Sequence, residues 1–313
     1  MVYGNHKPVV GDTELRLLHV FVTVARHQGL AAAQNELNLS LPTISAHMAR
    51  LESRLGVRLC ERGRSGFRMT SEGKRVYELS LSLLGAVDDF VSNVGALHNR
   101  LVGSLRIGII DNIANNPACK IHEAIGRFDA MDNDVEINVE MTAPNELERS
   151  VTDGRFNLGI GPASKHLPSL DYQRLFYERQ QLYCAANHEL FTIEGPDKIE
   201  QGVARARYVA HLFPIPEFNA AGRKLQTAAT SHTMESVAVL LLSGRYIGFL
   251  PTHYAGYWEE KNQMRALLPE RYYYETDFFA ISRKHRQSSP LLAEFLRVLE
   301  EVHGQEGAAS PNP

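Results

Sequence analysis

The sequence predicts an α/β protein in three parts: a small helical head, one long helix, and a two-lobed body of alternating strands and helices. Three observations predict this organisation. Short helical patterns fill the first 70 residues, a seven-residue apolar repeat follows over 71–100, and strand and helix patterns alternate after residue 103. A chain of 313 residues is long enough for two or three domains that each bury a core.

Formal charge is distributed unevenly along the chain. Residues 1–75 hold 11 Lys and Arg against 6 Asp and Glu, a formal charge of +5. The remaining residues hold 22 against 30, a formal charge of −8. A basic N-terminal part on an acidic body is typical of a module that binds a polyanion, and chance segregation is the alternative.

The three cysteines, Cys60, Cys119 and Cys184, lie far apart and form no CxxC motif. This spacing predicts buried free thiols in a reducing compartment, without disulfides or a zinc site; a redox-sensing pair is the alternative. The N-terminus lacks the apolar core of a signal peptide, and the longest apolar run, from Val237 to Leu242, is too short to span a bilayer. We therefore expect a cytoplasmic protein with no membrane partner.

Three helices are predicted in the head, which is expected over 13–70 after an N-terminal extension over 1–12. Helical spacing begins at Thr13, and Gly29 is expected to end the first helix. The alanine-rich segment 30–37 predicts a second, short helix whose small side chains allow close packing.

The third helix is predicted from Ser40 to Leu55. Ser40 is a good N-cap, Pro42 is tolerated in the first turn, and Gly56 ends the helix. Apolar residues recur at helical spacing on its buried face: Ile44, Met48, Leu51 and Leu55. The opposite face carries Thr43, His47, Arg50 and Arg54.

Two short strands are predicted around Arg64, Ser65 and Gly66, directly after the third helix. Three short helices with a tight turn before the third, followed by a basic hairpin, indicate a winged helix-turn-helix. In that arrangement the third helix enters the major groove of DNA and the wing lies along the backbone or the minor groove. The alternative is a small helical domain with a solvated basic loop. DNA contacts are expected from Ser40, Leu41, Pro42, Thr43, Ser45, His47, Arg50, Arg54, Arg62, Arg64 and Arg68.

The segment from Leu15 to about Ser80 resembles the N-terminal domain of LysR-type transcriptional regulators. The match is densest over LESRLGVRL, residues 51–59, and continues through Glu61-Arg62 to the Thr70-x-x-Gly73 ending. The resemblance implies sequence-specific binding to double-stranded operator DNA with an interrupted inverted repeat.

The chain departs from the family pattern at several positions. It has Leu41 where the family usually has glutamine, Cys60 where phenylalanine is usual, and Gly29 where serine commonly caps the second helix. Leu41 cannot hydrogen-bond a base edge, although its side chain can touch a thymine methyl. Base readout is therefore expected to rest on the polar and small residues near it: Pro42, Thr43, Ser45 and His47.

A linker helix for dimerisation is predicted over 71–102. Apolar residues recur there at alternating spacings of four and three: Leu83, Val87, Phe90, Val94 and Leu97. A heptad with both seam positions apolar is the pattern of a coiled coil. We expect self-association as a dimer, and the family resemblance implies a tetramer. Burial of this stripe against the chain's own C-terminal domain is the alternative.

The body is predicted over 103–303, followed by a disordered tail over 304–313. Alternating strands and helices predict a parallel sheet with helices on both faces. The predicted strands are 104–111, 135–141, 156–162, 207–213, a segment closed by Pro251, and 277–283. The predicted helices run from Asn116-Pro117 to Phe128, from Pro144 to Asp153, up to Gly244, and from Leu291 to Val302.

Three segments of the body, RIGII, DGRFNLGIG and LLSGRYIGFLP, resemble the effector-binding domain of LysR-type regulators. The resemblance implies a periplasmic-binding-protein-like fold, with lobe I at about 103–172 and 281–303 and lobe II at about 173–280. The aspartate usual in the second segment is here Asn157.

An effector site is expected between the lobes, beyond the carboxyl ends of the strands. This rule selects ten residues: Asp111, Asn112, Asn115, Gly161, Pro162, Ser231, His232, Thr233, Thr252 and His253. Hydroxyl and N–H groups of 231–233, before a predicted helix, are suited to an anion, with simple capping as the alternative. Asp111 would instead suit an amine, an amide or a water-filled pocket. We expect a small polar or anionic metabolite.

Enzyme motifs are absent from the sequence, which has no GK[ST] phosphate loop, no HExxH and no GxSxG. His232 and His253 are not at metal-ligand spacing. We therefore expect no catalytic residue, metal or cofactor, and a transcriptional regulator for which RNA polymerase is a further expected partner. The alternative is a cytosolic small-molecule binding protein whose basic head serves protein interaction.

Overall fold

The computed structural model describes residues 12–63, 66–98, 100–211, 225–284 and 289–304. The chain falls into two compact units, Met1–Val91 and Ser92–Pro313. The elements of the first unit are α1 (Asp12–Arg26), α2 (Gln34–Leu37), α3 (Leu41–Leu55), β1 (Cys60–Gly63), β2 (Gly66–Met69) and α4 (Ser71–Ala96), whose last residues belong to the second unit.

Helices α1 and α3 bury their apolar faces against each other and form the core of the head. Phe21, Ile44, Met48 and Leu51 are fully buried in it. Two predicted boundaries were wrong. Helix α1 ends at Arg26 rather than at Gly29, and only Gln34–Leu37 of the predicted helix 30–37 is helical. The alanines before α2 form hydrogen-bonded turns instead, with Ala33 N donating to Gly29 O at 3.3 Å.

Both predicted ends of the third helix are confirmed. The Ser40 side chain accepts a hydrogen bond from Thr43 N at 3.4 Å, and Gly56 ends the helix with a φ of 68°. That left-handed conformation costs glycine little because it has no Cβ. The predicted wing is also present, since β1 and β2 pair antiparallel with Cys60 opposite Met69. Its turn, residues 64–65, lies outside the described residues.

The wing is fixed to the helices by partly buried hydrogen bonds. Glu52 on α3 accepts hydrogen bonds at Oε1 from Leu59 N at 2.8 Å and Cys60 N at 3.3 Å. After the wing, Thr70 Oγ1 accepts from Gly73 N at 2.9 Å and so caps the start of α4. A Cβ on Gly73 would lie 1.9 Å from Leu59 O, so only glycine fits there. These contacts give the Thr70-x-x-Gly73 pattern a physical role.

Helix α4 is a single long helix that carries much of its apolar stripe on the surface. Leu83 packs partly against the core of the head. Phe90 is 68% exposed and Val94 is also exposed, and Leu97, 81% exposed, lies just beyond the helix end at Ala96. Within the part of the chain that the structure describes, this stripe is therefore largely uncovered.

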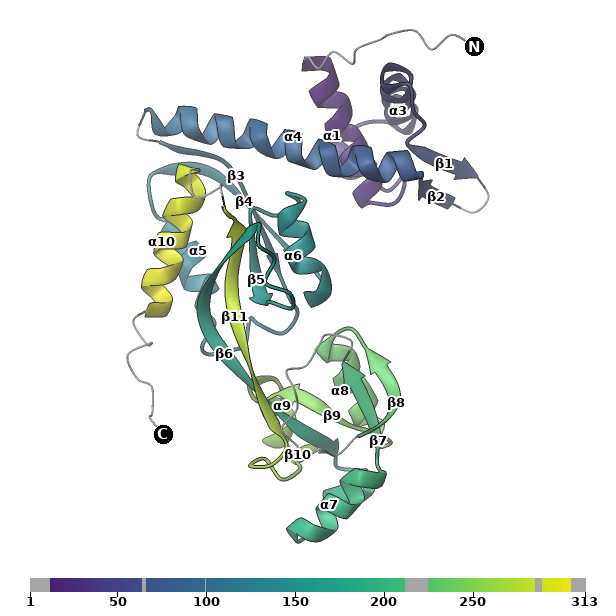
Figure 1. The fold of residues 1–313 in the computed structure, drawn as a ribbon, viewed down its shortest axis with the longest axis vertical. Helices are drawn as coiled ribbons and strands as arrows, with labels where there is room; N and C mark the ends of the chain where they lie inside the picture. Colours follow the sequence, from purple (N-terminus) through teal and green to yellow (C-terminus); the bar gives the residue numbers. More distant parts are fainter. Residues whose placement is uncertain (1–11, 64–65, 99, 212–224, 285–288, 305–313) are drawn as a thin grey trace. The chain divides into compact units, whose positions relative to one another are not determined.

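The second unit is built on one sheet (Figure 1). Its nine strands within the described residues are β3 (Leu101–Ile109), β4 (Asn133–Met141), β5 (Leu158–Pro162), β6 (Leu170–Ala185), β7 (Arg207–His211), β8 (Gln226–Ser231), β9 (Ile247–Pro251), β10 (Met264–Ala266) and β11 (Tyr273–Arg283). Their order is β4-β3-β5-β11-β6-β9-β7-β8, with β10 paired to β6.

The sheet is parallel only in part. Strands β4, β3 and β5 are parallel to one another in the first lobe, and β8, β7 and β9 in the second. The long strands β6 and β11 run antiparallel to each other and to their neighbours. The predicted parallel sheet is therefore present within each lobe, whereas β6, which the sequence did not predict, and β11 add antiparallel pairing between the two parallel groups.

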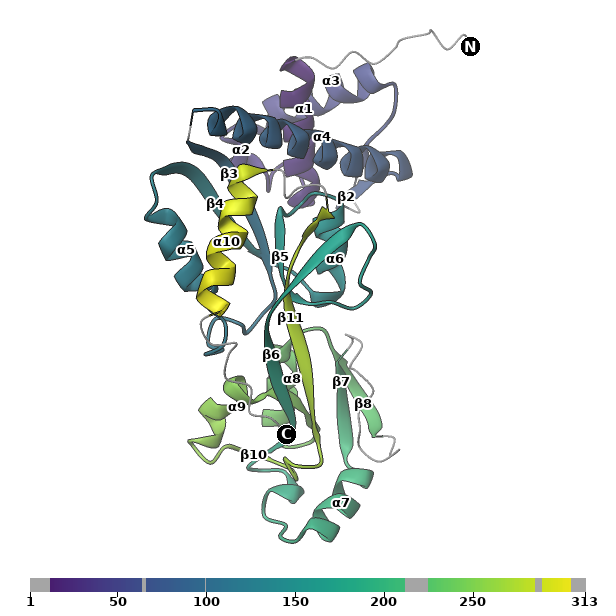
Figure 2. The ribbon, with the colours of Figure 1, turned by 60° about the vertical axis from the view of Figure 1, so that its left-hand side comes forward.

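Helices cover the sheet on both faces, as predicted. In the second unit they are α5 (Ile121–Asp129), α6 (Pro144–Thr152), the 3₁₀ turn η1 (Glu189–Phe191), α7 (Pro196–Arg205), α8 (Met234–Leu242), α9 (Thr252–Glu259) and α10 (Pro290–Gly304). In the first lobe α5 and α10 lie together on one face and α6 on the other (Figure 2).

Helix α5 begins four residues later than predicted. The Asn116 side chain accepts from Ala118 N at 3.0 Å, and its carbonyl accepts from Cys119 N at 2.9 Å. Asn116 therefore organises a turn rather than the start of a helix, as asparagine often does. Lys120 N then donates to His303 Nε2 at 3.1 Å, which fixes the helix start against α10.

Strands β6 and β11 run from one lobe into the other (Figures 1 and 2). Phe176 and Phe278 stack in the core of the first lobe, with ring centroids 4.8 Å apart. Leu182 and Tyr274 belong to a core of the second lobe. The passage between the lobes therefore lies inside these two strands, at 176–182 and 274–278.

No helix of the described residues is long and apolar enough to cross a membrane.

We predict that Glu52→Ala loosens the wing. The substitution leaves the N–H groups of Leu59 and Cys60 without their acceptor, which should lower the stability of the head by about 2 kcal/mol. Hydrogen exchange over residues 57–70 should become faster. Glu61→Ala, at an exposed position of β1, is the control and should exchange like the wild type. Equal exchange in the two variants would contradict the role given to Glu52.

Candidate functional site

Two surfaces carry the residues predicted to act: the start of α3 with the wing in the first unit, and a pocket in the second. On α3, Leu41 is 41% exposed, Pro42 and Arg50 are exposed, and Thr43, Ser45 and His47 are half-buried. The Ser40 hydroxyl lies 2.8 Å from that of Thr43. The structure thus brings the predicted base-reading residues together on one helix.

The arginines of the head differ in their surroundings. Arg54 Nη1 lies 2.6 Å from Oε1 of the buried Glu14, so its charge already has a partner on α1. Arg68 on β2 is exposed. Arg64 and the side chain of Arg62 lie outside the described residues. Of the three predicted wing contacts, Arg68 is thus the one whose side chain is seen to be accessible.

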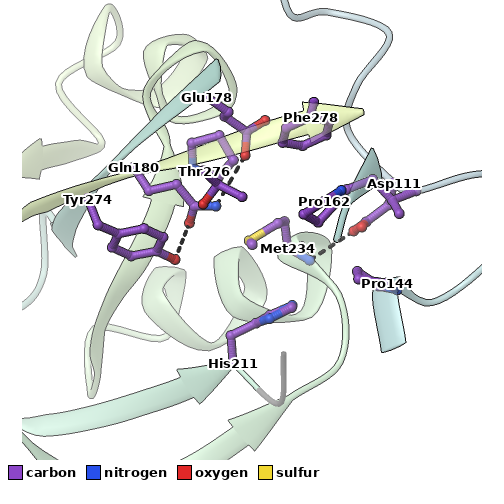
Figure 3. Close-up of a pocket in the computed structure, with 12 residues that line it drawn as sticks. Asp111, Pro144, Pro162, Glu178, Gln180, His211, Met234, Tyr274, Thr276 and Phe278 are labelled. Atoms are coloured by element: carbon purple, nitrogen blue, oxygen red, sulfur yellow. Dashed lines mark hydrogen bonds between the residues drawn. The ribbon is translucent and has the colours of Figure 1, made fainter. Parts of the chain in front are cut away.

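A pocket in the second unit is lined from both lobes (Figure 3). About 480 Å³ of space, part of it open to solvent, lies between its lining residues. Its lining residues come from the ends of β3, β5, β7 and β9, the starts of α6 and α8, and the middle of β6 and β11: Ile110, Asp111, Pro144, Pro162, Glu178, Gln180, His211, Met234, Pro251, Tyr274, Thr276 and Phe278. This is the position expected for a ligand of a two-lobed α/β domain.

Asp111 joins the two lobes across this pocket. Its Oδ2 accepts a hydrogen bond at 2.8 Å from Met234 N, the first residue of α8 (Figure 3). The same oxygen accepts from Asn112 Nδ2 at 2.9 Å. A carboxylate is stabilised at a helix N-terminus by unpaired N–H groups and the helix dipole. The helix N-terminus that was predicted to bind an anion of the effector is therefore occupied by the protein's own carboxylate.

The hydroxyls predicted to hold an effector serve as caps. The Ser231 hydroxyl donates to Thr233 O at 2.8 Å and accepts from Thr233 N at 3.2 Å. Thr233, rather than Ser231, is the N-cap of α8, and its Oγ1 accepts from Ser236 N at 3.2 Å. Neither side chain is among those that line the pocket, and His232 is exposed. The contacts of Ser231 and Thr233 are thus those of helix capping, which was the alternative to effector binding.

The other predicted residues divide between the pocket and its surroundings. Pro162 lines the pocket, whereas Gly161 is buried behind it, where a Cβ would lie 2.7 Å from Leu147 Cδ2. Asn112 adopts a φ of 62°, and its carbonyl lies 3.0 Å from His253 Nε2. Two predicted residues, the exposed Asn115 and the half-buried Thr252, do not line the pocket.

The polar wall of the pocket was not predicted from the sequence. Glu178, only 6% exposed, accepts at Oε1 from Gln180 Nε2 at 3.1 Å. The Tyr274 hydroxyl donates to Gln180 Oε1 at 2.7 Å. A signal was present, because alternation along β6 places Phe176, Glu178, Gln180 and Leu182 on one buried face. Two polar residues within an apolar alternation point to a site or a buried network.

Burial raises the pKa of Glu178 to about 7; hydrogen bonds from Gln180 and Asn116 oppose this rise, and the charge of Asp111 adds to it. His253 Nε2 lies 3.9 Å from Glu178 Oε2, but the pair is not an ion pair at neutral pH. Burial lowers the pKa of His253, and its Nε2 is within hydrogen-bond distance of Asn112 O. No lysine or arginine is among the described residues that line the pocket.

Two family models match the chain. The model described as "Bacterial regulatory helix-turn-helix protein, lysR family" matches residues 15–74, and the model described as "LysR substrate binding domain" matches residues 98–304. The chain belongs to the LysR family. It is therefore a LysR-type transcriptional regulator with a DNA-binding helix-turn-helix and an effector-binding domain, as the sequence resemblance implied.

Relatives within the LysR family cover nearly the whole chain. The HTH-type transcriptional activator BauR of Pseudomonas aeruginosa is 39% identical over 291 residues, covering 93% of this chain and 95% of that protein. CfxR of Cupriavidus necator, an HTH-type transcriptional regulator, is 26% identical over 259 residues, or 77% of each chain.

Solved structures of LysR-family regulators share the fold. The crystal structure of CbnR superposes with a TM-score of 0.60 at 17% identity, covering 92% of this chain and 99% of that one. Full-length CbnR complexed with its target DNA gives a TM-score of 0.60 at 19% identity, covering 92% and 98%. The predicted fold class, a winged helix-turn-helix followed by a linker helix and a two-lobed periplasmic-binding-protein-like domain, is confirmed.

We predict that Glu178→Gln stabilises the second unit at alkaline pH. An unfolded glutamate has a pKa near 4.5, so between about pH 4.5 and 7 the folded state holds a proton that the unfolded state loses. Wild-type stability should therefore fall as pH rises through this window and level off above it. Glutamine is neutral at every pH. The free energy of unfolding of the variant should therefore exceed that of the wild type by up to about 3 kcal/mol at pH 8 and by little at pH 4.

The chain's only tryptophan, Trp258 on α9, reports unfolding of this unit by fluorescence. Glu275→Gln removes an exposed acid from the neighbouring strand and should follow the wild type at every pH. A stability difference between Glu178→Gln and the wild type that does not change with pH would show that Glu178 is ionised in the folded protein from about pH 4.5 to 7.

Proposed function

We propose that this regulator binds an operator with an interrupted inverted repeat and changes its regulatory output when a small polar metabolite occupies the pocket of the second unit. The observation that carries the effector part is the Asp111–Met234 hydrogen bond, because it crosses the pocket and links the end of β3 to the start of α8. A ligand that alters this bond would favour one lobe arrangement over another, which is what control of a two-state protein requires.

The DNA part of the proposal rests on the exposed start of α3 and the basic wing. Residues at the N-terminal end of the second helix of a helix-turn-helix contact base edges, and basic residues beside it neutralise phosphates. The proposed contacts are those expected from the sequence: Ser40, Leu41, Pro42, Thr43, Ser45, His47, Arg50, Arg54, Arg62, Arg64 and Arg68. The pairing of Arg54 with Glu14 favours a smaller role for that residue. The known complex of CbnR with its target DNA supports DNA binding by this fold.

Self-association is proposed through α4, as a dimer that pairs further into a tetramer. The exposed side chains of Phe90, Val94 and Leu97 form an apolar stripe that a second copy would cover. Two heads held together would read two half-sites, which raises affinity without new contacts.

We further propose that the protein acts in the cytoplasm as an activator rather than as an enzyme. BauR, 39% identical over most of both chains, is named a transcriptional activator, which supports this direction of control. RNA polymerase is then the partner through which activation would occur.

The operator proposal predicts different effects from the wing and from α3. Arg68→Ala should weaken binding to operator and unrelated DNA by similar factors and lower the salt slope by about one. Thr43→Val and His47→Ala should instead change the preferred sequence. Fluorescence anisotropy at several salt concentrations measures the first effect, and selection from a randomised DNA pool measures the second.

Arg149→Ala is the matched control for loss of positive charge, since Arg149 is exposed on α6 of the second unit. An Arg68→Ala variant with the salt slope of the wild type, or unaltered sequence preference in both α3 variants, would contradict this docking.

The assembly proposal predicts that Phe90→Asp with Val94→Asp dissociates the α4 pair. Two carboxylates would be buried in an apolar seam without partners, and that cost exceeds the benefit of closing the seam. Analytical ultracentrifugation should show a lower mass, and operator affinity should fall with it. Ser82→Asp adds a charge at an exposed polar position of the same helix and should keep the wild-type mass. The same mass for both variants would place self-association elsewhere.

A further inference from the structure

We propose that the effector carries an ammonium group, which docks between the carboxylates of Asp111 and Glu178. This inference rests on the proposed function, because it names the chemical class of the ligand for the pocket assigned there to an effector. The two acids line the pocket from different strands, Asp111 just beyond the end of β3 and Glu178 in the middle of β6 (Figure 3).

The charge of the pocket carries the argument. Two carboxyl groups line it, one of them more than nine-tenths buried, and no lysine or arginine stands among the described lining residues. A buried carboxylate without a counter-charge is unfavourable, so such sites exist where a cation completes them or where a proton neutralises them. A ligand ammonium supplies both the charge and up to three hydrogen-bond donors.

The titratable groups around the two acids do not supply this charge. From β7, His211 also lines the pocket; burial lowers its pKa, and the charge of Asp111 opposes this shift. From α9, His253 is kept neutral near pH 7 by burial. From β11, Tyr274 donates its hydroxyl to Gln180, and its pKa is raised by burial. Before α5, burial likewise raises the pKa of the Cys119 thiol, which stays protonated. Asp111 adds negative charge.

A ligand carboxylate is disfavoured by the same geometry. The N-terminus of α8, which is suited to an anion, already holds Asp111 through Met234 N at 2.8 Å. An incoming carboxylate would have to displace Asp111 and would then lie beside two acids. An ammonium instead attracts Asp111, and competition with Met234 N–H for its oxygens connects ligand binding to the bond that links the lobes.

Three probes of nearly equal size test the charge preference: butylammonium, butyrate and butyramide. Saturation-transfer NMR on the full-length protein detects the weak binding expected of such small ligands and gives their relative affinities by titration. We expect butylammonium to bind at least about tenfold more tightly than either of the others. Absence of binding by butylammonium, or equal or tighter binding of butyrate or butyramide, would overturn the inference.

Isosteric variants assign the docking groups. Asp111→Asn and Glu178→Gln should each weaken butylammonium by about tenfold or more, because each removes one charge-assisted hydrogen bond. Glu275→Gln, an exposed acid on β11, should bind like the wild type. Wild-type affinity in both pocket variants would place the ammonium elsewhere and overturn the inference.

Proton linkage provides a readout that a merely structural role would not change. Burial raises the pKa of Glu178 to about 7, whereas an alkylammonium keeps its proton to about pH 10. Butylammonium affinity should therefore rise between pH 6 and pH 8 in the wild type, as Glu178 ionises. The rise should be absent in Glu178→Gln. An affinity that falls over this range in the wild type would contradict docking on Glu178.

Filling the pocket separates this inference from the proposed function. Met234→Trp places a larger side chain at the lining position on α8, and Glu260→Trp places the same side chain on an exposed position after α9. Butyrate that binds at least as tightly as butylammonium, and whose binding Met234→Trp abolishes and Glu260→Trp keeps, would overturn the charge preference and leave the pocket as the effector site. If both tryptophan variants still bind all three probes, the pocket is not the effector site.

Discussion

The second unit depends on two long antiparallel strands, β6 and β11, that take part in the cores of both lobes. Phe176 and Phe278 pack in one core, and Leu182 and Tyr274 pack in another a few residues further along the same strands. Between these positions, at 177–181 and 275–277, no residue of either strand belongs to an apolar core, and three of the buried residues are polar. Glu178, Gln180 and Thr276 occupy this stretch and become the wall of the pocket.

The resulting pocket combines an anion-binding helix N-terminus, that of α8, with two carboxyl groups in its lining. Asp111 accepts a hydrogen bond from Met234 N at the start of α8, and the hydroxyls of Ser231 and Thr233 accept from Thr233 N and Ser236 N. A polar residue before a helix therefore does not identify a ligand site unless its capping role is first accounted for. Here the hydroxyls serve as caps and do not line the pocket, whereas the two carboxyl groups do.

The head shows the same distinction between residues that build a surface and residues that use it. Glu52 and Gly73 belong to the segments that most resemble the LysR family, but their contacts hold the wing and the start of α4 in place. The side chains proposed to contact DNA lie between them and before them, on α3 and the wing. A dense motif match therefore identifies the domain more securely than it identifies the contacts.

Sequence alone determined the family, the winged helix-turn-helix, the long helix and most strands of the body, because caps, glycine stops and apolar periodicity act locally. Ser40, Gly56 and Pro144 begin or end their helices as predicted. Only the tertiary structure decided that Asn116 makes a turn, that β6 and β11 cross between the lobes, and that Asp111 meets Met234, 123 residues away. These outcomes depend on which distant segments are neighbours, and hydrogen bonds between distant segments leave no periodic trace in the sequence.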